Sequence, residues 1–111
     1  MDVLLIIKVL GEPMRFKIFQ CLLERKHCVR SLSKKLSVTE SAISQHLKIM
    51  MECGLVYGKR FGYHIHYFPN QKTVDFLAEA FFQMQEKSKN MDRDTSICNC
   101  EFKNLHNGEE K

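Results

Sequence analysis

The sequence has no tryptophan, two prolines and five glycines in 111 residues. So little glycine and proline excludes collagen-like and low-complexity chains. An apolar content of 44% is also too high for an intrinsically disordered protein. The length suits one compact domain with its own core, and it is too short for a two-domain enzyme.

Long hydrophobic runs are missing as well. The most apolar stretch, Val3 to Leu10, is eight residues long and is interrupted by Lys8. A membrane-spanning helix needs about 20 apolar residues, so we expect no membrane partner. No basic segment precedes this stretch, as it would in a secretory signal peptide, and we expect a cytoplasmic protein.

Motifs of catalysis are absent from the sequence. It contains no nucleophile elbow, no glycine-rich phosphate loop and no recognisable pair of catalytic carboxylates. We therefore predict that the protein is not an enzyme.

Charge is unevenly distributed. From Met1 to Phe68 there are eleven Lys and Arg against five Asp and Glu, whereas the remainder has six against eight. The positive charge thus lies in the first two-thirds of the chain, where we expect a polyanion to bind.

The spacing of apolar residues predicts a mostly α-helical fold with one β-hairpin. Asp2 is a suitable N-cap for a first helix to Leu10, and Pro13 suits the first turn of a second helix. On that second helix Phe16, Phe19, Leu22 and Leu23 are expected to share the buried face. Two further helices, at about 30–36 and 40–53, are separated by a three-residue turn, which predicts a helix-turn-helix.

The fourth helix carries the strongest functional signal. Thr39 is its predicted N-cap and Gly54 its left-handed C-terminal residue. Ile43, Leu47 and Met50 recur at helical spacing and should face the core. The opposite side carries an uncharged or basic stripe that suits DNA base edges and phosphates, made of Ser41, Ser44, Gln45 and Lys48.

A period of two follows from Leu55 to Phe68, with a turn at Phe61-Gly62, and predicts a hairpin of two short strands. Lys59 and Arg60 directly precede the turn, so we expect a basic loop beside the helix-turn-helix. Such a wing reaches the phosphate backbone or the minor groove of DNA.

A last helix is predicted to end near Lys89, and its apolar residues lie on more than one side. Such a helix usually buries one side in its own domain and the other against a partner. The sequence then becomes polar. We therefore divide the chain into a domain at 1–90 and a cysteine-containing tail at 91–111.

The order of these motifs resembles the ArsR/SmtB family of bacterial metalloregulatory repressors. The likeness covers about residues 5–88. It rests on Gly11 to Phe19, on Ser33 to Leu47 with its Ser-Gln-His-Leu segment, on Gly54-Leu55-Val56 and on Arg60 to Tyr63. The resemblance implies a winged helix-turn-helix fold.

Several functional expectations follow from the resemblance. It implies a homodimer built from the first and last helices, which binds a palindromic DNA operator and is released by an inducer. By position, the residues that face DNA are then Ser41, Ser44, Gln45, His46 and Lys48 on the fourth helix, with Arg60 and Tyr63 in the wing.

The sequence departs from the family's familiar metal sites. Arsenic-type sensors carry Cys-Val-Cys at the third helix, where this chain has Cys28-Val29-Arg30. Zinc-type sensors place Asp-x-His on the last helix, where this chain has Asp75-Phe76-Leu77. The inducer is therefore not fixed by the resemblance.

The odd number of cysteines, five, argues against a structural disulfide framework. Cys98-Asn99-Cys100 provides two thiols that can chelate a thiophilic ion, and a third thiolate would complete the trigonal site preferred by As(III). We therefore predict an inducer site for As(III) or another thiophilic metal made by Cys28, Cys98 and Cys100. Cys21 and Cys53 are predicted to be packing residues.

Two alternatives remain open at this stage. The same cysteines could oxidise to a disulfide and make the protein a thiol redox-sensing repressor. Alternatively, the winged helix could be a protein-interaction module that uses its basic face on an acidic partner and does not bind DNA.

Overall fold

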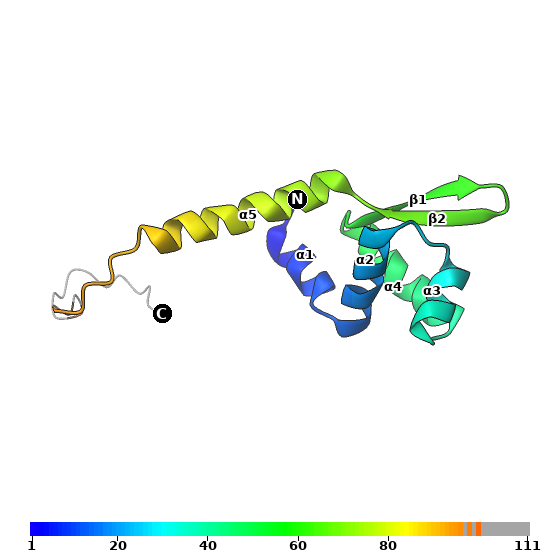
Figure 1. Cartoon of the computed structure of the whole chain (residues 1–111), viewed down its shortest axis with the longest axis horizontal. Helices are drawn as coiled ribbons and strands as arrows, with labels where there is room; N and C mark the ends of the chain where they lie inside the picture. Colours follow the sequence, from blue (N-terminus) through cyan, green and yellow to red (C-terminus); the bar gives the residue numbers. More distant parts are fainter. Residues whose placement is uncertain (97, 99, 101–111) are drawn as a thin grey trace.

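The computed structural model describes residues 1–96, 98 and 100. Within that part the chain forms five α-helices and one antiparallel hairpin (Figure 1). This mostly helical architecture with a β-hairpin confirms the predicted fold class. The elements are α1 (Val3–Leu10), α2 (Pro13–Glu24), α3 (Val29–Leu36), α4 (Glu40–Glu52), β1 (Val56–Phe61), β2 (His64–Pro69) and α5 (Gln71–Lys89).

The hydrophobic core lies between the first four helices and the start of β1. Apolar side chains from each of these elements are buried in one cluster. The most deeply buried members are Ile6, Ile18, Leu32, Ile43, Leu47, Met50 and Leu55.

The prediction of which α2 residues face the core was partly wrong. Phe19 and Leu22 are buried as expected, but Ile18 and Cys21 complete the face instead of Phe16 and Leu23. Phe16 and Leu23 are about half exposed. The helix has apolar residues on several sides, so spacing alone did not decide which side the core would select.

The helix ends follow the sequence prediction closely. The side chain of Asp2 accepts hydrogen bonds from the backbone N–H groups of Leu4 and Leu5 at 3.0 and 3.3 Å. Thr39 Oγ1 accepts one from Ala42 at 3.1 Å. Gly54, just after α4, has a φ of 82°, a conformation that glycine adopts without the cost of a Cβ.

The hairpin forms the predicted wing, with Val56 opposite Pro69 and Phe61 opposite His64. Lys59 and Arg60 lie within β1 rather than in a loop, which corrects the sequence prediction, and Gly62 and Tyr63 make the turn. Close packing across the strands requires Gly58. A Cβ there would lie 2.9 Å from Ile65 Cγ2.

The helix α5 begins at the corner between α4 and the wing. Thr73 is completely buried, and its Oγ1 donates a hydrogen bond to the carbonyl of Gly54 at 2.6 Å. The helix then runs past α1 and continues away from the rest of the domain (Figure 1). Among the described residues, we find no helix long and apolar enough to cross a membrane.

Candidate nucleic-acid interface

The helix α4 presents the predicted polar stripe to the outside. Ile43, Leu47 and Met50 are at most 1% exposed. The four residues of the stripe are all exposed, and they are Ser41, Ser44, Gln45 and Lys48. The side that holds the domain together and the side left free for a ligand are therefore separated on one helix.

The turn between α3 and α4 is rigidly built. Ser37 adopts the left-handed conformation, with a φ of 58°. The backbone N–H of Val38 donates to the carbonyl of Ser33 at 3.2 Å, and the Ser33 hydroxyl donates back to the carbonyl of Val38. These reciprocal bonds fix the angle at which α4 leaves α3.

His46 lies apart from the other predicted DNA-facing residues. Its side chain is 24% exposed, and its Nδ1 lies 3.9 Å from the carboxylate oxygen Oε1 of Glu12 at the start of α2. The structure therefore directs this imidazole toward the protein's own second helix.

The wing exposes the two residues assigned to it. Arg60 is exposed on β1, and Tyr63 at the turn is 99% exposed. Lys59 is exposed beside them, and its Nζ lies 6.0 Å from the centre of the Phe61 ring. The hairpin tip therefore presents cationic groups, which suit a phosphate backbone, beside aromatic rings.

Three further basic residues lie on α3 and were not predicted from the sequence to contact DNA. Arg30, Lys34 and Lys35 are all exposed, and the two lysines lie in the last turn of α3, just before the turn into α4. Their position before a predicted recognition helix could have identified them as candidates for phosphate contacts.

Cys28 is the N-cap of α3. Its Sγ accepts a hydrogen bond from the backbone N–H of Ser31 at 3.4 Å. Burial raises the pKa of this thiol, but the hydrogen bonds from Ser31 and Arg30 outweigh burial and leave the pKa below its ordinary value. His27 beside it is buried, and its Nδ1 is 2.9 Å from the Ser31 hydroxyl.

We predict that Cys28 is the most readily alkylated of the three free thiols. Burial raises the pKa of the Cys21 thiol, so Cys28 should react with iodoacetamide at neutral pH about tenfold faster than Cys21. Peptide mass spectrometry over time measures both rates, with half-buried Cys53 as the control. Equal alkylation rates for Cys28 and Cys53 would contradict the prediction that Cys28 is the most reactive thiol. The substitution Ser31→Ala should slow the alkylation of Cys28 and leave the rates of the other two thiols unchanged.

The structure does not bring the three predicted inducer ligands together within one chain. Cys98 and Cys100 are joined by a disulfide bond. They follow α5, whose C-terminal end lies at the opposite end of the molecule from α3 (Figure 1). Among the described residues, no group of three or more His, Cys, Asp and Glu side chains is arranged to hold a metal ion.

The two packing cysteines behave as predicted, since Cys21 is buried and Cys53 donates to the Met50 carbonyl.

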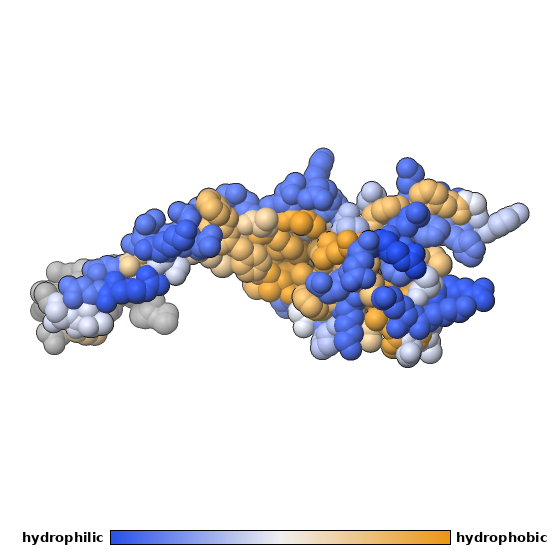
Figure 2. Space-filling view, viewed as in Figure 1, coloured by the Kyte–Doolittle hydropathy of each residue, from blue (hydrophilic) through white to orange (hydrophobic). Residues whose placement is uncertain are grey.

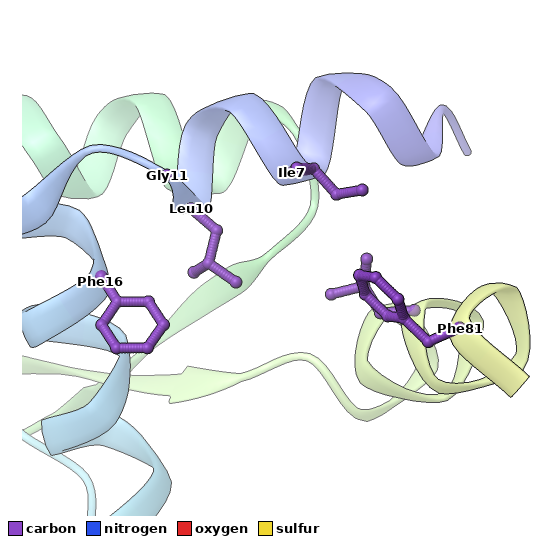
Figure 3. A pocket seen from close by; sticks show the side chains of 6 residues that line it. Ile7, Leu10, Gly11, Phe16 and Phe81 are labelled. Atoms are coloured by element: carbon purple, nitrogen blue, oxygen red, sulfur yellow. The ribbon is translucent and has the colours of Figure 1, made fainter. Parts of the chain in front are cut away.

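A broad apolar surface covers α1 and the neighbouring part of α5 (Figure 2). Leu4 is 63% exposed, Phe81 51% and Met84 52%. Between the two helices lies an apolar cavity of about 220 Å³ (Figure 3), lined by Ile7, Leu10, Gly11, Phe16, Leu77 and Phe81. Single exposed apolar residues are common on proteins, but a continuous patch of this kind marks an interaction site.

The recognition helix, the hairpin beside it and the supporting helices define a winged helix-turn-helix protein. Residues 12–57 match the family described as "Bacterial regulatory protein, arsR family". This match over the helix-turn-helix region confirms the resemblance to that family seen in the sequence. The family and its relatives are transcriptional regulators and not enzymes.

Individual relatives agree with this assignment. The HTH-type transcriptional repressor SmtB of Mycobacterium tuberculosis is 37% identical over 62 residues, which cover 56% of this chain and 46% of SmtB. The chain thus spans about half the length of this curated relative.

Solved structures show the same fold. A possible transcriptional regulator for arsenical resistance has a TM-score of 0.64 and 29% identity, covering 71% of this chain and 82% of that protein. The homodimeric winged helix-turn-helix domain of Mb0332 from Mycobacterium bovis has a TM-score of 0.63 and 18% identity, covering 83% and 85%. At that identity the second likeness concerns the fold alone.

Proposed function

We propose that the protein is a dimeric repressor that binds a DNA operator through α4 and the wing. The observation that carries this proposal is the exposed polar stripe of α4 on a helix-turn-helix. A helix of this kind enters the major groove, where hydroxyl, amide and ammonium groups reach base edges and phosphates. The exposed cations of α3 and the wing supply phosphate contacts on both sides of it.

The apolar surface of α1 and α5 supports the dimer. Glu86 and Lys89 form an ion pair near the end of α5, whereas Phe81, Phe82 and Met84 earlier on the helix remain half exposed. A second copy related by two-fold symmetry would cover these residues and the cavity between the helices. Two copies then present two recognition helices to half-sites one turn of DNA apart.

Two single substitutions, each made in a separate variant, test the proposed DNA interface. Gln45→Ala should relax sequence preference and cost about 1–3 kcal/mol of operator binding, because a bidentate amide contact to a base is lost. Arg60→Ala should weaken binding almost evenly across sequences, because it removes a phosphate contact.

Titrations with duplex DNA from the protein's own promoter and with a scrambled duplex measure both effects. Unchanged affinities for both duplexes in both variants would contradict the assignment. Binding that lacks sequence preference and weakens little with added salt would favour the protein-interaction module instead.

We further propose that thiol chemistry controls the release from DNA. The pair Cys98 and Cys100 would chelate As(III) or another thiophilic ion when reduced, with Cys28 as the third ligand. Since Cys98 and Cys100 follow α5 and lie far from α3 in one chain, a complete three-thiol site requires these cysteines to move or to come from the partner protomer. The second candidate is a redox response of the same pair, in which a peroxide oxidises the two adjacent thiols to a disulfide.

Separate titrations with arsenite and with peroxide distinguish these two inducers. If the metalloid is the inducer, Cys98→Ser and Cys100→Ser should reduce As(III) affinity to background and make operator binding insensitive to arsenite. If oxidation is the inducer, the same variants should lose only the response to peroxide. Cys53→Ser is the matched control, and wild-type responses in all three variants would exclude the tail thiols.

A further inference from the structure

The position of His46 needs a physical explanation. The imidazole Nδ1 is buried and, in the described part of the chain, has no hydrogen-bond partner. A buried polar atom without a partner costs free energy, so such an atom in a native protein calls for a reason. Its ionic neighbour is Glu12, with 3.9 Å between Nδ1 and Oε1.

Glu12 is itself held firmly at the corner between α1 and α2. Its Oε1 accepts the backbone N–H of Arg15 at 2.8 Å, which makes it the N-cap of α2. The Arg15 Nε–H donates in turn to the carbonyl of Val9 on α1 at 2.7 Å. Polar contacts thus lead from α1 through Arg15 and Glu12 to His46 on α4.

The charge of Glu12 is favoured by the same arrangement. The hydrogen bond from the Arg15 backbone holds the pKa of the Glu12 carboxyl below its ordinary value, burial opposes this, and the nearby His46 and Arg15 side chains lower it further. A carboxylate fixed in this way is a suitable partner for an imidazole that carries a proton on Nδ1.

We propose that His46 is a positioning residue, whose pairing with Glu12 sets the angle of α4 against the corner between α1 and α2. It therefore does not read the operator directly, although its neighbours on the helix do. Gly11, next to Glu12, lines the apolar cavity between α1 and α5. The pair therefore joins the recognition helix to the corner of the chain that borders this cavity. The inference rests on the proposed DNA-binding function.

A double-mutant cycle tests the pairing. Glu12→Gln keeps an oxygen for the Arg15 N–H and removes the charge, and His46→Gln removes the imidazole. Each single variant should bind the promoter duplex about fivefold more weakly, and the double variant should also lose about fivefold, because the two residues act as one unit. Affinity for a scrambled duplex and the thermal midpoint should change little. Lys48→Gln combined with Glu12→Gln is the control and should show additive losses.

A spectroscopic measurement separates pairing from a purely structural role. The ¹⁵N resonance of His46 Nδ1 should shift in Glu12→Gln, while that of His64, exposed on the wing, should not. If Glu12→Gln fails to fold, Glu12→Asp replaces it. It keeps the charge and the cap but lengthens the distance to His46, so the same shift and loss of preference are expected.

The outcomes distinguish the two levels of the proposal. Sequence-specific binding with additive losses for Glu12 and His46, or an unmoved His46 resonance, would overturn the positioning role and leave the repressor intact. A wild-type protein that binds promoter and scrambled duplexes equally would overturn the repressor and, with it, the positioning role.

Discussion

Truncation of Leu47 to alanine should destabilise the protein by about 2–5 kcal/mol, because it removes buried methyl groups and leaves a cavity that the core fills only in part. Leu47 is 1% exposed on the inner side of α4, between Ile43 and Met50, which are also fully buried. Urea denaturation followed by circular dichroism measures the loss as a lower midpoint with an unchanged slope.

The matched control is Ile49→Ala on the same helix. Ile49 is 39% exposed, so its truncation should cost less than about 1 kcal/mol. Similar losses for the two variants would mean that α4 does not have the separated buried and exposed sides on which its role as a recognition helix depends.

Replacement of Phe81 by glutamate should convert the proposed dimer to a monomer. Phe81 lines the apolar cavity with Ile7 and Leu10 of α1, and half of its surface is exposed in the single chain (Figure 3). A carboxylate buried in such an interface would be desolvated without a partner. Sedimentation velocity at micromolar concentration measures the change in mass.

The same variant should bind the promoter duplex about 10² times more weakly, since a monomer loses the second half-site. Tyr57→Glu on the wing is the control. Tyr57 is 47% exposed, so the introduced charge is similar, but the dimer should persist. A Phe81→Glu protein that sediments as a dimer would place the interface elsewhere.

The sequence predicted the elements that depend on local rules. The N-caps Asp2 and Thr39 accept the hydrogen bonds expected of them. The strict spacing of Ile43, Leu47 and Met50 defined the inner face of α4. A helix with one apolar stripe and a suitable cap has one way to pack, so its orientation can be obtained without coordinates.

The features that the sequence did not predict depend on tertiary contacts. The second helix carries apolar residues on several sides, and only the packing of α1 and α5 decides that Phe16 lies at the cavity while Ile18 enters the core. The sequence placed His46 among the DNA-facing residues of α4. Its contact with Glu12, 34 positions earlier, follows from the packing of α2 on α4.

The cysteines also show the difference between features set by local sequence and features set by the whole fold. The N-cap position of Cys28 is a local feature, and its altered pKa follows from the first turn of α3. The distance between α3 and the end of α5 is a property of the whole fold. Spacing within the sequence could therefore suggest a pair at Cys98 and Cys100, but it could not test whether a third thiol lies near them.

The part of α5 beyond Leu77 has a consequence for the folding of the chain. Beyond Leu77 most residues of the helix are exposed. An isolated helical segment of this length is marginal in water. We therefore expect the helicity of this segment to rise with protein concentration, because in the proposed dimer each protomer would cover the last helix of the other.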